Sequence, residues 1–79
     1  MYRAIVIDCP SRRYWLINGR VDPSQGKQIL EQLDQHDATV IFVAASGGRL
    51  EFHQRMLRVM GFQLDQTKQP DTQPPFSNN

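Results

Sequence analysis

The stretch at residues 21–27 (VDPSQGK) combines residue types that bind anions in proteins. A strand end leads into a helix there, and exposed N–H groups at a helix start attract anions. Gly26 lets a ligand approach the backbone, and Lys27 adds positive charge. The favoured alternative is that Asp22 caps the helix and Gly26 packs on a sheet, because a carboxylate at the cap opposes an anion.

A second strand-to-helix turn, Ser46-Gly47-Gly48-Arg49, offers a possible nest of N–H groups for an anion. It has neither the G-x-x-x-x-G-K-[ST] nor the G-x-G-x-x-G spacing of the common nucleotide-binding loops. Turn geometry by itself accounts for both glycines, and this interpretation is favoured.

Basic side chains occur in loops and at helix starts. They would form one patch for an anionic partner if those loops met at one end of a sheet; the favoured alternative is a solvated rim. The set is Arg12, Arg13, Arg20, Lys27 and Arg49. The net charge is only +1, and residues 29–48 carry acidic groups without Lys or Arg, so nucleic acid is not the expected partner.

The candidate nucleophile and metal ligands are isolated. His36 and His53 have no partner at metal-ligand spacing, so no metal site is predicted. His53 is expected on the second helix as a residue at the boundary between core and solvent, and Cys9 as a small buried group. Tyr14 and Trp15 are neighbours on a strand, so one of the two should be exposed, and Trp15 is assigned to a partner contact together with Arg12, Arg13 and Arg20.

The chain has 79 residues, 39% of them hydrophobic, which corresponds to one small domain. Residues 66–79 contain three prolines and a single large apolar residue, so we expect a disordered tail after a globular domain at residues 1–65. There is one cysteine, no apolar run long enough to span a membrane and no signal-peptide pattern. A cytoplasmic location is therefore predicted.

The hydrophobic pattern predicts six elements. Strands are expected at residues 2–9, 14–18 (extending to Val21 with a bulge at Gly19), 39–45 and 62–64, and helices at residues 23–35 and 49–60. The second helix should end at Gly61. Its buried side should contain Phe52, Met56, Leu57, Val59 and Met60.

The element order is β-β-α-β-α-β, which predicts a small mixed sheet of the α/β (α+β) class. The first two strands should form an antiparallel hairpin. Residues 39–45 are apolar on both faces and are expected in the centre of the sheet. The strand, helix and strand from residue 14 to residue 45 predict a right-handed parallel crossover.

Residues 14–64 resemble the C-terminal half of an acetyltransferase of the GNAT superfamily. Val21-Asp22-Pro23 is similar to the family's turn, Gln25-Gly26-Lys27 to its pyrophosphate loop and residues 58–62 (RVMGF) to its closing signature. The resemblance implies that backbone N–H groups near Gln25, Gly26 and Lys27 face the pyrophosphate of acetyl-CoA.

The sequence also departs from this family. The loop has one glycine where two are usual, and the position of the family's general-acid tyrosine is Leu57. The N-terminal half that holds the acceptor substrate has no counterpart in the chain, so the resemblance describes a truncated GNAT-like fold.

These departures favour a non-catalytic interaction module over an enzyme. It would act through a protein partner or as a homodimer, joined by the sheet edge or by Trp15. The alternative is an acyl-CoA-binding protein, or a minimal acetyltransferase that completes its site as a dimer.

Overall fold

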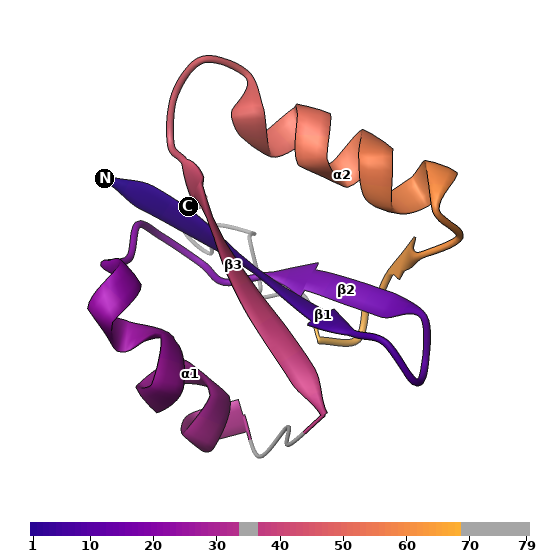
Figure 1. Ribbon diagram of the computed structural model, residues 1–79, viewed down its shortest axis with the longest axis horizontal. Helices are drawn as coiled ribbons and strands as arrows, with labels where there is room; N and C mark the ends of the chain where they lie inside the picture. The colour runs from indigo at the N-terminus through magenta and orange to yellow at the C-terminus, as the bar shows by residue number, and fades with distance from the viewer. Residues whose placement is uncertain (34–36, 69–79) are drawn as a thin grey trace, which may run out of the picture.

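The computed structural model describes residues 1–33 and 37–68. It contains four strands and two α-helices, the first of which follows a short 3-10 turn. The elements are β1 (Tyr2–Asp8), β2 (Arg13–Leu16), η1 (Pro23–Gln25), α1 (Gly26–Leu33), β3 (Ala38–Ala44), α2 (Arg49–Val59) and β4 (Gln63–Leu64). The predicted class is confirmed: a small mixed α+β domain with the expected order of elements (Figure 1).

The four strands form one sheet in the order β3-β1-β2-β4. β1 is antiparallel to both of its neighbours, and β2 pairs in parallel with β4. The prediction that residues 39–45 form a central strand is wrong, because β3 lies at an edge and β1 takes the central position. β3 is apolar on both faces because both helices contact it, α1 from one side and α2 from the other.

The crossover from β2 through α1 to β3 joins two strands that run in the same direction. They are not neighbours, because β1 lies between them and bonds to each. The β1–β2 hairpin occupies one side of β1, and β3 pairs with the other side. The local element sequence does not specify this choice of edge.

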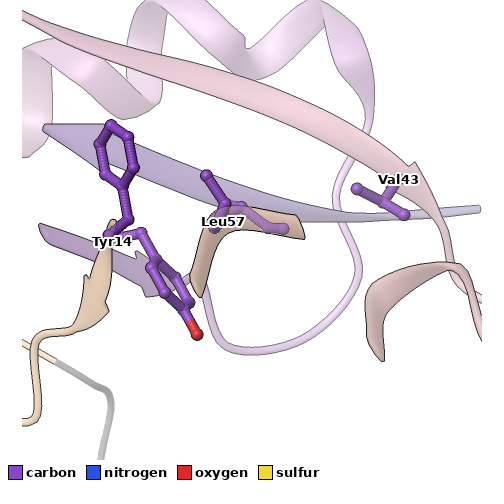
Figure 2. Packing of buried hydrophobic residues seen from close by; sticks show 5 residues of the cluster. Tyr14, Val43 and Leu57 are labelled. Carbon is purple, nitrogen blue, oxygen red and sulfur yellow. The ribbon is translucent and has the colours of Figure 1, made fainter. Parts of the chain in front are cut away.

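The two helices cover opposite faces of the sheet, which gives three layers (Figure 1). Alternate residues of β1 point to opposite faces. Ile5 belongs to the core cluster beneath α2, which also contains Tyr14, Val43, Leu57 and Phe62; Figure 2 shows Tyr14, Val43 and Leu57. The buried residues Ala4, Val6, Trp15 and Ile29 belong to the other layer, beside α1.

The ends of the helices agree with the sequence signals. Asp22 caps η1 through a capping box with Gln25. Gly61 follows α2 with a φ of 94°, and Phe62 N–H donates to Leu57 O at 2.8 Å, the bonding pattern of a Schellman motif. α1 is described as far as Leu33, and residues 34 and 35, over which the first helix was predicted to continue, lie outside the described residues.

The predicted tail begins in an ordered turn. Residues 66–68 form a turn in which Asp65 accepts from Thr67 N and Thr67 Oγ1, at 3.1 and 2.6 Å. The Lys68 Nζ lies 4.8 Å from the centre of the Trp15 ring. The ordered part of the chain therefore extends past residue 65, and the rest of the predicted tail, residues 69–79, lies outside the described residues.

Candidate functional site

The start of the first helix has most of its N–H groups occupied by the chain itself. Ser24 N donates to Asp22 Oδ1 at 2.9 Å, and Asp22 N donates to Gln25 Oε1 at 2.8 Å. Gln25 N donates to Asp22 O, and Gly26 N donates to Pro23 O. The hydrogen bond from the Ser24 backbone holds the pKa of Asp22 below its usual value, so this carboxylate keeps its charge where an anion would bind.

Gly26 has a packing role in this structure. A Cβ placed on it would lie 3.3 Å from the Cε2 and Cζ atoms of Phe42, so the helix approaches β3 as closely as it does because the residue lacks a side chain. Gln25 and Lys27 are exposed. The capping and packing roles favoured from the sequence thus account for Asp22, Gln25 and Gly26.

The turn before α2 also follows backbone geometry. Gly47 and Gly48 have φ values of 79° and 71°, which are left-handed conformations that favour glycine. α2 has no side-chain cap, and Phe52 N donates to Gly48 O at 3.1 Å. Both α-helices begin at the same end of the sheet, since the last residue of β3, Ala44, and also Val21 pair with Tyr2.

Two open depressions lie at this end of the sheet, and Arg20 lines both. One has a volume of about 360 Å³ and includes Asp22 and Gln25 in its wall. The other, of about 500 Å³, is lined by Arg3 and Asn18, and Arg3 Nε has no hydrogen-bond partner although it is buried. Two guanidinium groups therefore border a hollow that sequence reasoning did not identify, because Arg3 lies inside a strand.

The five predicted basic residues do not meet in one patch. Arg12 and Arg13 lie at the β1–β2 turn, whereas Arg20 and Arg49 lie at the opposite end, where the helices begin. Arg12 is also engaged: its guanidinium lies 5.6 Å from the centre of the Phe62 ring, and Nη1 donates to Met60 O at 3.4 Å. The condition for a single basic patch, that these loops meet at one end of the sheet, is therefore not met, because the hairpin separates the two arginine pairs.

Trp15 and Tyr14 are both buried, with exposed fractions of 2% and 0%. The prediction that one of them is exposed for a partner is wrong. Tyr14 belongs to the core cluster beneath α2, and Lys68 from the turn after β4 lies over the Trp15 ring, so neither face of β2 is free. The Tyr14 hydroxyl donates to Gln54 Oε1 of α2 at 3.4 Å.

Cys9, His36 and His53 were the isolated candidates for a nucleophile or a metal ligand. Cys9 is exposed, not buried as predicted, because β1 ends at Asp8 and leaves Cys9 in the turn. His53 is half-buried within α2, as predicted for a residue between core and solvent, with Nδ1 2.9 Å from Arg49 O. His36 lies outside the described residues. Residues 1–33 and 37–68 contain no group of three or more His, Cys, Asp or Glu that could hold a metal ion.

The outward surface of α2 is the largest departure from the predicted side-chain arrangement. The exposed fractions are 53% for Phe52, 43% for Met56, 77% for Val59 and 57% for Met60. The prediction that these four residues are buried with Leu57 is wrong, because α2 packs on the sheet through Leu50 and Leu57. The four side chains recur at i, i+4, i+7 and i+8, so they form a stripe along one side of the helix. We call this set the α2 stripe.

In residues 1–33 and 37–68 no helix is long and apolar enough to cross a membrane. No family model, no curated protein and no solved structure matches this chain.

Proposed function

We propose that this chain is a small, non-catalytic interaction module that acts through a protein partner or a second copy of itself. The observation that supports this function is the α2 stripe, Phe52, Met56, Val59 and Met60, which is exposed along the helix. Large apolar side chains scattered singly over a surface are ordinary, but a continuous row of them is typical of an interaction site.

The spacing of the stripe matches a known mode of recognition. Helices that bind in a hydrophobic groove use apolar residues at i, i+3, i+4 and i+7. Methionine supports such contacts, since its flexible thioether adapts to different surfaces. The proposal thus moves the partner contact from Trp15, which is buried, to α2, and the GNAT-like relationship and cytoplasmic location remain proposals.

A double variant, Met56→Glu with Val59→Glu, tests the stripe. A matched control, Gln28→Glu with Gln32→Glu, adds the same charge at exposed positions of α1. The mass in solution and the proteins retained from an extract of the source cells are measured for all three chains. We expect the stripe variant to lose the association that the wild type and the control keep; equal association by all three would refute the proposal.

A second candidate, acyl-CoA binding, has one favourable observation. The depression bordered by Arg3 and Arg20 offers two positive charges for phosphate groups. The loop implied by the GNAT resemblance, Gln25-Gly26-Lys27, supports it less, since capping and packing already use Gln25 and Gly26. Isothermal titration with acetyl-CoA tests this candidate, with Arg20→Gln expected to weaken any heat and Gln28→Glu expected to leave it unchanged.

A further inference from the structure

Within residues 1–33 and 37–68, β3 pairs with another strand on one side only, and its other side forms an edge of the sheet. Ala45 N donates to Met1 O at 3.2 Å, and Ile17 N donates to Ala4 O at 3.0 Å. In an antiparallel ladder the bonded pairs alternate, so in this register the odd-numbered residues of β3 bond to β1. The N–H and C=O groups of Val40 and Phe42 therefore point away from β1, toward the free edge.

This edge has none of the features that commonly prevent strand pairing. β3 is seven residues long (ATVIFVA), and it contains no charged residue and no proline. It pairs with β1 over its full length without a bulge. Natural sheets usually protect an edge with lysine, proline, a bulge or a very short strand. The opposite edge follows that rule, because β4 has only two residues.

We propose that the β3 edge pairs with the β3 edge of a second copy of this chain, in an antiparallel, two-fold symmetric dimer. This inference rests on the proposed function and names its partner. A two-fold axis beside Ile41 gives full overlap of the two strands, and Val40 then lies opposite Phe42 of the other copy. Favourable cross-strand pairs then form between Val40 and Phe42, between Thr39 and Val43, and between the two copies of Ile41. No like charges lie opposite each other.

The helix that carries the α2 stripe contacts the edge strand β3 in the fold. Helix geometry places the stripe roughly 120° around the α2 axis from the side that packs on the sheet. α2 runs above the sheet in Figure 1.

The sequence of β3 favours a second copy over an unrelated partner. The strand carries no charged residue over its seven positions, so two copies pair without opposing like charges. Closed two-fold symmetry requires this kind of self-complementary surface.

The mass of the full chain in solution tests the dimer. We expect sedimentation to give twice the 9.1 kDa of one chain. Thr39→Lys places a charge on the exposed side of the edge strand, and Val40→Pro removes an outward N–H without removing a bond to β1. Both variants should be monomeric. The control, Gln63→Lys, adds the same charge on the opposite edge strand and should remain a dimer.

Hydrogen exchange supplies a readout that folding defects do not imitate. The amide hydrogens of Val40 and Phe42 should exchange at least roughly tenfold more slowly in the dimer than in the Thr39→Lys variant. Trp15 fluorescence reports whether each variant is folded, and if Val40→Pro is unfolded, Thr39→Lys decides.

A wild-type chain that stays monomeric to about 0.5 mM overturns the β3 dimer. The β3 dimer is also overturned if the Thr39→Lys variant still dimerises while the amides of Val40 and Phe42 exchange fast. In both cases the Met56→Glu, Val59→Glu variant still judges the proposed function independently, since it tests the stripe against any partner.

Discussion

Truncation of Leu57 tests which side of α2 is the packing side. Leu57 is 7% exposed and belongs to the core cluster with Ile5, Tyr14 and Phe62. Leu57→Ala removes three carbon atoms, and at about 0.8 kcal/mol for each buried methylene the transfer cost is about 2.4 kcal/mol. A residual cavity raises the expected loss of unfolding free energy to about 3 kcal/mol.

Met60→Ala is the matched control on the same helix. Met60 is 57% exposed, so its truncation should cost less than about 1 kcal/mol in the monomer. Leu57→Ala should thus cost more unfolding free energy than Met60→Ala. The opposite order would be expected if the stripe were the buried side of α2.

Urea unfolding followed by Trp15 fluorescence measures both variants. Trp15 is the single tryptophan and is 2% exposed, so its emission should shift when the core opens. With a slope of about 1 kcal/mol per molar urea, Leu57→Ala should lower the midpoint by about 3 M. A loss of about 3 kcal/mol is a large part of the unfolding free energy of about 4–12 kcal/mol expected for a chain of this size. A variant that is already unfolded in water is therefore consistent with the prediction.

The experiment is repeated at a tenfold higher protein concentration. Association stabilises the folded state more at higher protein concentration, so a cost of Met60→Ala that grows with concentration reports the interface and not the core. Equal losses for Leu57→Ala and Met60→Ala at low concentration would refute the packing described above.

Further predictions concern the helix ends and the ordered turn after β4. Gly61→Ala should lower the unfolding free energy by about 1–3 kcal/mol, because a φ of 94° strains any residue with a Cβ; a thermal melt that matches the wild type would contradict this. Asp22 has a lowered pKa, so its contribution is present above about pH 4 and is lost as the pH falls through the lower, folded-state pKa. The difference in melting temperature between wild type and Asp22→Asn should therefore shrink in acid, and a pH-independent difference would argue against it. Lys68→Ala should cost less than about 1 kcal/mol and alter Trp15 emission, because the ammonium group lies over that ring; an unchanged spectrum would refute the contact.

The local elements of the fold were predictable because short-range signals specify them. Asp22, Pro23 and Gln25 predicted the helix start, and the capping box is present. Gly61 predicted the end of α2, where the Schellman bonds form. The β-branched residues of β1 predicted a strand buried on both faces, and Ile5 and Val6 are fully buried. These signals act within a few residues, so they do not depend on the rest of the molecule.

The candidate site was less predictable because exposure is a property of the whole fold. Phe52, Met56 and Val59 have the spacing of a core-facing helix side, and Leu50 and Leu57 offered an alternative side that the structure uses. Trp15 was expected at the surface because a strand has two faces, but the turn after β4 brings Lys68 over its ring. Whether the basic residues could meet also depended on the fold, since the β1–β2 hairpin carries Arg12 and Arg13 to the far end of the sheet.

The sequence by itself determined the order of the elements, their caps and the small mixed α+β class, since periodicity, proline and glycine act locally. Only the tertiary structure decided that β3 forms an edge, that α2 packs through Leu57, and that the stripe is exposed. Those outcomes depend on which strand pairs with which, and pairing between distant segments is governed by the packing of all layers together. The proposed interaction surface is therefore a product of topology.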